Sequence, residues 1–282
     1  MRIDLHTHST ASDGTDRPAD LVRLARETGL DVIALTDHDT TGGWREAAEA
    51  LPDGLTLVRG AEISCIDDDG ISLHMLGYLF DPEEPEFARA RELVRTDRVR
   101  RARAMVERCV ALGAPITWER VVEIAGDGAV GRPHVATALV EAGVIDDLAE
   151  AFTPDWLKDG GRAFVAKYEI AAVEAVRMIR AAGGVAVFAH PGASKRGRTV
   201  SDATIESLAA HGLGGIEVDH FDHDDDTRAH LRDLARGLDL PTTGSSDYHG
   251  SRKILALGLH TTAPDAYEAI MDQAHGVAPL TG

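Results

Sequence analysis

Residues 32–39 read Val-Ile-Ala-Leu-Thr-Asp-His-Asp, four apolar residues that run directly into a cluster of acids and a histidine. The apolar run has the length and the β-branched content of a buried strand. Packing alone does not explain why such a strand ends abruptly in Asp37, His38 and Asp39. The stretch therefore predicts a buried strand whose carboxyl end carries functional groups.

Apolar runs of similar length recur along the chain, and amphipathic patterns with helical spacing separate them. We expect further buried strands at Ile3–Leu5, Leu55–Val58, Leu73–Leu79, Val185–Phe188 and Gly215–Val218. Helical patterns occupy Pro18–Thr28, Ile170–Ala182, Thr204–Ala210 and Thr227–Gly237. Because strands and helices alternate at this pace, the sequence predicts an α/β fold with a parallel sheet or barrel.

The alternation breaks in the middle of the chain. Residues 85–162 have helical periodicity and no convincing strand pattern, with helices expected at Arg89–Leu112, Thr117–Ile124, Pro133–Glu141 and Asp146–Phe152. We therefore predict a small helical insertion domain at residues 85–162, which binds substrate. The α/β domain would then consist of residues 1–84 and 163–282.

The composition indicates a globular protein with an acidic surface. The 282 residues are 44% hydrophobic, and 29 basic against 47 acidic side chains leave a formal net charge of −18. An acidic surface repels long polyanions, so we expect no binding to extended nucleic acid, whereas a small phosphorylated substrate or the end of a short strand is compatible with it. Because we find no amino-terminal signal and no membrane-length apolar run, we expect a cytoplasmic protein without membrane contact.

Histidines and carboxylates stand near the ends of several expected strands. His6 and His8 are two residues apart, so on a strand they share one face and can hold one ion; the alternative is one buried and one exposed histidine. Taken alone, His74 fits a core histidine better than a ligand. Functional groups of parallel α/β barrels gather at the carboxyl ends of the strands, so the joint pattern predicts one site. Its candidate members are His6, His8, Asp13, His38, Glu62, His74, His190, Asp247 and His249.

Nine mixed nitrogen and oxygen ligands are too many for one ion, so the pattern predicts two or three divalent ions that share a bridging carboxylate. The donor set suits Zn²⁺, Mn²⁺ or Fe²⁺, and the chain has no thiolate set that would demand a structural zinc site. Clustered ions that clamp an attacking and a leaving oxygen are a common device for cleaving phosphate esters. We therefore expect a metal-dependent phosphoesterase in which a metal-bridging hydroxide attacks phosphorus.

These motifs resemble those of the polymerase and histidinol phosphatase (PHP) family in order and spacing. The resemblance implies a distorted barrel of the (β/α)7 type with the helical insertion. It also implies how the ligands divide. His6, His8, Glu62 and Asp247 would hold one ion. Glu62 would bridge to a second ion held by His74 and His190, and Asp13, His38 and His249 would hold a third.

Within that family, the chain resembles the branch of nucleoside 3′,5′-bisphosphate phosphatases and of exonucleases that act on the 5′ ends of short RNA. This finer resemblance rests on Gly131-Arg132-Pro133-His134 and on Lys167. It implies a nucleoside bisphosphate, a nucleoside monophosphate or a short oligoribonucleotide as substrate, bound by Arg132, His134 and Lys167. Arginine can make two parallel hydrogen bonds to a phosphate, and lysine offers a point charge. The alternatives are surface cations and, for His134, a residue at a helix N-terminus.

Two further groups of residues have competing interpretations. Lys195-Arg196-x-Arg198 follows His190 and is a second basic candidate, but a solvated loop accounts for it equally well. His220 and His223 follow another expected strand. One interpretation is that they line the pocket together with Asp222–Asp226; we favour the other, that all of these residues form a solvated acidic turn that leads into a helix.

Two other classes of function stay open. A metal-dependent amidohydrolase acting at carbon also uses His-x-His strands, but it usually needs a ligating lysine, and no expected strand end carries an obvious one. A non-catalytic PHP binding module, such as a domain retained beside a polymerase, would have no need of the complete ligand set. An assay with a generic phosphate ester and Mn²⁺ separates the three classes.

Overall fold

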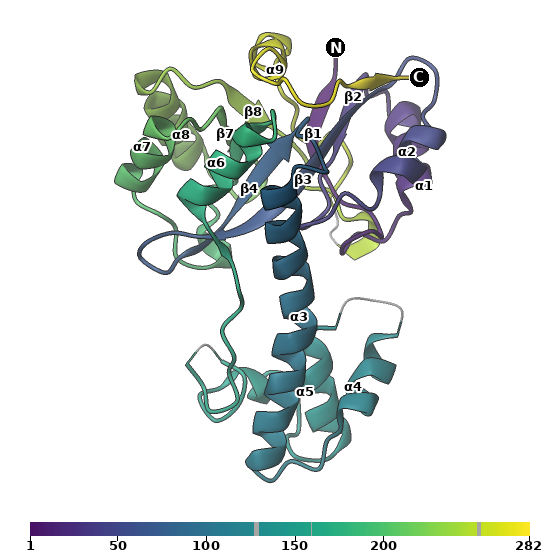
Figure 1. Ribbon diagram of the computed structural model, residues 1–282, viewed down its shortest axis with the longest axis vertical. Coiled ribbons are helices and arrows are strands. Elements are labelled where there is room, and N and C mark those ends of the chain that lie inside the picture. Colours follow the sequence, from purple (N-terminus) through teal and green to yellow (C-terminus); the bar gives the residue numbers. More distant parts are fainter. Residues whose placement is uncertain (127–129, 159, 253–254) are drawn as a thin grey trace. The chain divides into compact units, whose positions relative to one another are not determined.

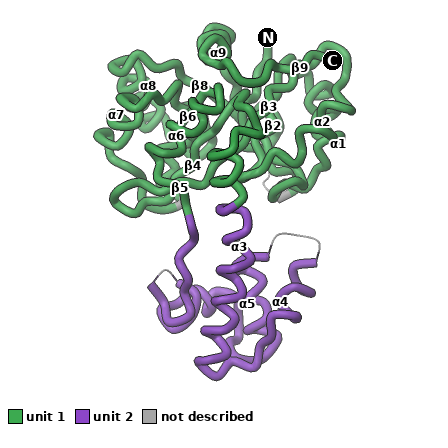
Figure 2. The backbone as a smooth tube through the Cα atoms, viewed as in Figure 1, with its two compact units in different colours: residues 1–92, 169–282 green, residues 93–168 purple. Residues whose placement is uncertain are grey.

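The computed structural model describes residues 1–126, 130–158, 160–252 and 255–282, and it divides the chain into two compact units. Unit 1 consists of Met1–Glu92 and Glu169–Gly282, and unit 2 consists of Leu93–Tyr168 (Figure 2). Both boundaries lie a few residues further along the chain than the sequence predicts. The first boundary moves because helix α3, Pro85–Ala111, begins in unit 1 and continues in unit 2.

A nearly closed sheet forms the centre of unit 1. Its main path runs through seven strands, and Thr7 pairs with Tyr248 in a parallel bridge that nearly closes the path. Two short strands, β5 (Ile170–Ala171) and β9 (Leu280–Thr281), pair with β3 outside this path. The path is β1 (Ile3–Thr7), β2 (Val32–Leu35), β3 (Thr56–Ile66), β4 (Ser72–Tyr78), β6 (Val185–Ala189), β7 (Gly215–Asp219) and β8 (Thr242–Gly244). The expected distorted seven-stranded barrel is confirmed.

Helices flank this sheet. Figure 1 shows α1 (Pro18–Glu27) and α2 (Trp44–Glu49) on one side, and α6 (Ala172–Ala181), α7 (Asp202–Ala210) and α8 (Asp225–Gly237) on the other. The short helix α9, Pro264–Met271, follows the last strand of the path. Apolar side chains of the strands, among them Ile3, Leu5, Val32, Leu76 and Val187, all at most 2% exposed, form a core cluster that also includes Ile270 of α9. Burial of this apolar surface is the main source of the unit's stability.

Strand β3 is longer than the sequence predicts, and it changes partner halfway. Residues Thr56–Arg59 pair with β2 in parallel, and residues Gly60–Ile66 pair with β4 in antiparallel register. The change of partner brings two backbones close at Gly60, where a Cβ atom would lie 2.8 Å from the carbonyl oxygen of Gly77. Glu62 therefore lies inside a strand, and the expectation that it follows the end of one is wrong.

Strand β4 departs from the expected parallel order, because it runs antiparallel to both β3 and β6. Its beginning therefore lies at the edge of the sheet where the parallel strands end. His74, the third residue of β4, pairs with Ala189 at the end of β6 and with Ser64 of β3. His74 thus reaches the same edge as the residues after β6, although it does not follow a strand end.

Unit 2 has its own hydrophobic core, in which Met105, Cys109, Val121 and Leu139 are completely buried. Helices α3, α4 (Trp118–Ala125) and α5 (Arg132–Glu141) surround this core. The Thr117 side chain caps α4 by accepting a hydrogen bond from the backbone N–H of Arg120. At the ends of the unit, the backbone N–H of Tyr168 donates to Asp97 Oδ2 over 2.7 Å.

The helix expected at Asp146–Phe152 is reduced to a single 3₁₀ turn, Glu150–Phe152. The cause is local. The Asp147 carboxylate accepts hydrogen bonds from the backbone N–H groups of Ala149 and Glu150. Aspartate side chains compete with the helical ladder in this way, so they favour turns over helix interiors.

Candidate metal centre

The structure brings all nine predicted ligand side chains into one cluster within unit 1. Four overlapping groups each place three or four ligand atoms within 4.8 Å of one another. The groups share His6, His8, His38 and Glu62, so they form one connected set rather than four separate sites. They are His8–Asp13–His38–His249, His6–His8–Asp247, His6–Glu62–His190 and His38–Glu62–His74.

The atoms around His6 and His8 have the spacing of ligands to a common ion. The two Nε2 atoms are 3.1 Å apart, and each is 3.2 Å from Glu62 Oε2. Asp247 Oδ1 lies 3.6 Å from His6 Nε2 and 3.4 Å from His8 Nε2. Two atoms that each bind one ion at about 2.0–2.2 Å are themselves about 3–3.5 Å apart. These four side chains are the set that the family resemblance implies for the first ion.

Glu62 faces two sets of histidines with its two carboxylate oxygens. Its Oε1 lies 2.7 Å from His74 Nδ1 and 3.1 Å from His190 Nε2. Its Oε2 lies near His6 and His8, and 3.1 Å from His38 Nδ1. A carboxylate oriented in this way can bridge two ions, one on each oxygen.

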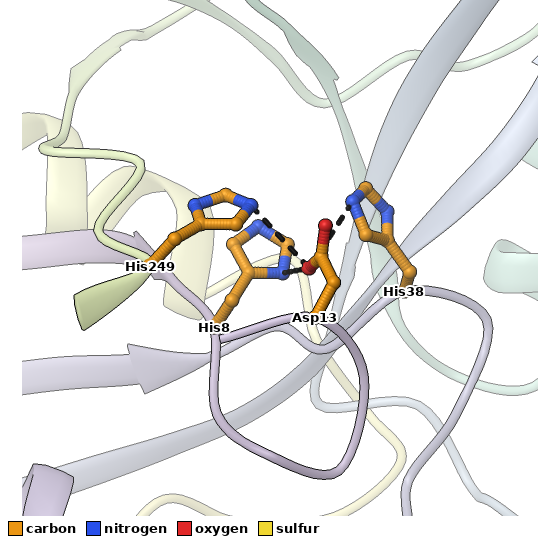
Figure 3. Close-up of side chains that lie close together, drawn as sticks. All are labelled: His8, Asp13, His38 and His249. Atoms are coloured by element: carbon orange, nitrogen blue, oxygen red, sulfur yellow. Dashed lines mark ion pairs between the residues drawn. The ribbon is translucent and has the colours of Figure 1, made fainter. Parts of the chain in front are cut away.

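Asp13 gathers the third set of side chains (Figure 3). Its Oδ1 lies 3.4 Å from His249 Nε2, 3.8 Å from His38 Nε2 and 3.8 Å from His8 Nδ1. Asp13 is half-buried, whereas His8 and His249 are buried. This set is wider and more open to solvent than the first, and it adds His8 to the predicted trio.

The buried polar atoms of the cluster fit a resident cation. The Nδ1 atom of His8 is buried and makes no hydrogen bond within the described residues. Burial alone would lower the pKa of His6, but the carboxylates of Glu62, Glu217 and Asp247 outweigh burial and raise that pKa well above its usual value. The carboxylates therefore require positive charge beside them, which protons supply in the metal-free chain and divalent ions can supply instead.

Buried acid–serine pairs hold the backbone around the ligands. Asp37 accepts hydrogen bonds from both the backbone N–H and the hydroxyl of Ser9, at 2.8 and 2.7 Å. Asp4 does the same with Ser246, the residue before Asp247. Asp39 does the same with Ser64, two residues after Glu62. Each pair fixes a segment that carries a candidate ligand, so the acids beside the histidines have a structural role.

Strained backbone occurs at two of the candidate ligands. His190 has φ 33° and Asp247 has φ 50°, in the left-handed region that side chains other than glycine rarely adopt. Such conformations cost of order 1–3 kcal/mol and persist where surrounding contacts hold them in place, commonly at functional sites. Both strained residues lie in the turns that follow strands β6 and β8.

The interpretation of His220 and His223 as members of a solvated turn is wrong, because both are buried, at 0% and 2% exposure. His220 Nε2 lies 3.4 Å from Asp247 Oδ2, and His223 accepts a hydrogen bond from the backbone N–H of Gly192. Glu217 of β7, which we did not single out, contacts His6. The sequence contained a sign of both residues, because His220 directly follows β7 and Glu217 is an acid within an apolar strand.

The three predicted substrate contacts belong to unit 2. His134 is the third residue of α5, and its Nδ1 accepts a hydrogen bond from the backbone N–H of Gly131, which caps the helix. This contact supports a structural role for His134. Arg132 is the first residue of α5 and is half-buried, and Lys167 is exposed.

A cavity of about 200 Å³ adjoins the cluster within unit 1. His74 and His190 contribute to its wall, and Leu73, Phe188 and Val200 line it with apolar surface. The basic segment after His190 borders this cavity through Arg198, whose guanidinium donates to the Asp69 carbonyl oxygen. The side chain of Arg196 lies outside the described part of the structure. None of the helices in the described residues has the length and apolar character required to cross a bilayer.

Several known proteins are similar to this chain over most of its length. Residues 4–117 match the model of the PHP domain. The chain is 35% identical over 251 residues to a 5′-3′ exoribonuclease of Haemophilus influenzae, covering 88% of this chain and 90% of that protein. It is 33% identical to a 3′,5′-nucleoside bisphosphate phosphatase of Chromobacterium violaceum, covering 88% and 87%. A crystal structure from Bifidobacterium adolescentis, described as a metal-dependent phosphoesterase, has a TM-score of 0.80 and 37% identity, covering 98% of this chain and 96% of that one.

Proposed function

This chain belongs to the PHP family, a family of metal-dependent phosphoesterases, and we propose that it hydrolyses phosphate esters of small nucleotides. Nucleoside 3′,5′-bisphosphates and nucleoside monophosphates are the proposed substrates, and the 5′ end of a short oligoribonucleotide is the second candidate. One observation carries the proposal. Glu62 presents each of its oxygens to a different set of histidines, an arrangement that suits two adjacent ions acting on one phosphate.

The side chains of the cluster have distinct roles in this proposal. As the family resemblance implies, His6, His8, Glu62 and Asp247 would hold one ion, Glu62 with His74 and His190 a second, and Asp13 with His38 and His249 a third. When bound, divalent ions supply positive charge to the phosphoryl oxygens and lower the pKa of water. The proposed ions are Mn²⁺, Fe²⁺ or Zn²⁺, because mixed nitrogen and oxygen donors suit these metals.

The cavity beside the cluster offers a place for the group that is esterified to the phosphate. It adjoins His74 and His190, and its other walls are largely apolar. A nucleoside has the right character for such a space, because its base is flat and apolar on both faces. Small phosphate-containing ligands also remain compatible with a net charge of −18, which disfavours extended nucleic acid.

Unit 2 is the proposed source of contacts to a second phosphate. Arg132 begins α5, where the helix N-terminus favours negative charge, and its guanidinium can bind a phosphate through two hydrogen bonds. Lys167 can add a point charge. His134 would act indirectly, because its ring nitrogen already caps the helix that carries Arg132.

The experiment is a substrate panel on protein that has been stripped of metal and reloaded with Mn²⁺. Release of phosphate or of a 5′ nucleotide from nucleoside bisphosphates, monophosphates or 5′-phosphorylated short oligoribonucleotides supports the proposal. Cleavage of amide substrates without phosphate release would support an amidohydrolase. Tight metal binding without turnover of any ester would instead indicate a binding module.

A further inference from the structure

Glu217 of strand β7 is completely buried beside the candidate metal centre, yet it belongs to none of the four groups of candidate ligands. Its carboxylate has three partners. Oε1 lies 3.0 Å from His6 Nδ1 and accepts a hydrogen bond from the Ser245 hydroxyl, and Oε2 accepts a hydrogen bond from the backbone N–H of His190 over 2.8 Å. One side chain thus contacts two candidate ligands that lie far apart in the sequence.

The contact with His6 determines which ring nitrogen faces the cluster. A carboxylate can only accept, so the Nδ1 atom of His6 must carry the proton that it donates to Glu217. The lone pair of a neutral ring then resides on Nε2, which lies 3.1 Å from His8 Nε2 and 3.2 Å from Glu62 Oε2. Metal-binding histidines commonly donate their other N–H to a carboxylate in this way, which fixes the tautomer and increases the basicity of the ligand.

We propose that Glu217 is a positioning residue of the metal centre, which fixes the tautomer of His6 and anchors the turn that carries His190. The proposal rests on the proposed function, because it takes His6 and His190 as metal ligands. It goes beyond that function in assigning a specific task to a strand that contributes no residue to the four ligand groups.

The residues that follow β7 have related positions. His220 Nδ1 accepts a hydrogen bond from the backbone N–H of Asp222, so its Nε2 carries the proton and faces Asp247 Oδ2 at 3.4 Å. His223 Nε2 accepts from the N–H of Gly192, two residues after His190. Together with Glu217, these histidines make β7 and its following turn a support for three candidate ligands: His6, His190 and Asp247.

The test measures metal affinity directly, without any enzyme assay. Glu217→Gln keeps the shape of the side chain, but its amide nitrogen cannot accept the hydrogen bond that one of the two oxygens now accepts. We expect Co²⁺ and Mn²⁺ to bind about 10- to 100-fold more weakly in competition with a chelator, the usual effect of removing such a partner. Glu206→Gln, at an exposed position of α7, is the matched control and should bind both metals as the wild type does.

A double-mutant cycle distinguishes positioning from general structural support. In a His6→Ala background the ligand that Glu217 orients is gone, so most of the effect of Glu217→Gln on affinity should disappear. An equal loss of affinity in both backgrounds, or no loss in either, would overturn the proposal. If the wild-type protein itself binds neither metal, the proposed function fails instead, so the two failures are separable.

Nitrogen-15 NMR of the histidine rings provides a second measurement that does not depend on the variant folding. Wild-type protein loaded with diamagnetic Zn²⁺ should show His6 protonated at Nδ1 and liganded at Nε2. A signal that identifies Nε2 as the protonated nitrogen of His6 would exclude the proposed role of Glu217.

Discussion

Glu62 is the residue on which the separate parts of the metal centre meet, since its oxygens lie 2.7–3.2 Å from five histidine rings. We predict that Glu62→Gln reduces bound metal and lowers kcat by more than about 100-fold, because an amide cannot bridge two cations through two negative oxygens. Elemental analysis and steady-state kinetics on the same preparation measure both effects. Glu206→Gln again serves as the control, and full metal occupancy with normal turnover would place Glu62 outside the site.

The contacts of His223 predict how the stability of the protein depends on pH. Its Nδ1 donates to the Val218 carbonyl oxygen and its Nε2 accepts from Gly192, a pair of bonds that only the neutral ring can make. Burial lowers the pKa of His223 below its usual value of 6.5. The unfolded chain therefore binds more protons than the folded chain as the pH falls through about 6.5, and the stability present above that pH is lost on acidification.

His223→Gln can keep a donor and an acceptor without titrating. We expect wild-type protein to lose up to about 1 kcal/mol more unfolding free energy than this variant between pH 7.5 and pH 5.5. Urea unfolding in the presence of a chelator at both pH values provides the comparison. Parallel losses in the two proteins would show that His223 is not charged on unfolding in this range.

At the scale of elements, β2 was predictable from the sequence, whereas the extension of β3 and the direction of β4 were not. The apolar run of β2 matches the observed strand residue for residue. Strand β3 continues seven residues beyond Arg59 because Gly60 allows it to exchange β2 for β4, and no periodicity marks that exchange. The polarity of β4 likewise depends on long-range pairing. Only the antiparallel direction brings His74, near the start of β4, to the edge where the parallel strands end, so strand order alone could not predict its place in the cluster.

The cluster itself was largely visible in the sequence, whereas the partners of the residues behind it were not. Ligands such as His38 and His190 interrupt apolar runs with polar groups that need an explanation, so they stand out. Supporting residues such as Glu217 and Asp4 lie inside strands, where a single acid indicates nothing about its partner. Their hydrogen bonds to Ser245 and Ser246 become apparent only once β1, β7 and β8 are assembled.

The position of Arg132 on helix α5 leads to a prediction about substrate specificity. If Arg132 binds a second phosphate, Arg132→Ala removes a charge-assisted hydrogen bond that contributes roughly 1.5–3 kcal/mol. The expected loss in kcat/KM on a nucleoside 3′,5′-bisphosphate is therefore about one to two orders of magnitude. A methyl phosphate ester lacks the second phosphate, and its kinetics should change little. Equal losses on both substrates would indicate that Arg132 stabilises the fold, and unchanged kinetics on both would exclude it from binding.

A second prediction concerns the cavity wall formed by the segment after β6. Val200 borders the cavity beside His74 and His190, so Val200→Trp should fill that space without removing a candidate ligand. We expect kcat/KM for nucleotides to fall about tenfold or more, with the activity on methyl phosphate and the metal content retained. Leu259→Trp, at an exposed position of the same unit, is the control. Unimpaired nucleotide turnover in Val200→Trp would show that the substrate's organic group lies elsewhere.

At the scale of the whole molecule, metal removal should change both the stability and its dependence on pH. Burial alone would lower the pKa of His8, but hydrogen bonds to Asp247 and Glu62 raise it to about 9 in the metal-free chain. A raised pKa stabilises the folded state fully below the unfolded value of about 6.5, and this contribution is lost as the pH rises through 9. The metal-free protein should therefore lose stability between pH 6.5 and pH 9.

The metal-loaded protein should behave in the opposite sense, because deprotonated histidines bind ions more tightly. An ion present at about 100 times its dissociation constant adds about 2.7 kcal/mol to the unfolding free energy. Differential scanning calorimetry with Mn²⁺ or with a chelator, at pH 6.5 and pH 8, measures the difference. A metal-induced rise in melting temperature that is larger at pH 8 agrees with the prediction, and a rise that shrinks with pH contradicts it.

The hydrogen bond between Tyr168 and Asp97 joins the two ends of unit 2, and Leu93 and Tyr168 line one common cavity. The chain thus departs into this unit and returns from it at neighbouring points. Segments with adjacent ends are the ones that tolerate transplantation between hosts, since a short linker can close the gap they leave. Unit 2 therefore has the geometry of an inserted domain that recombination can replace. A replacement would change substrate preference and leave the metal centre of unit 1 in place.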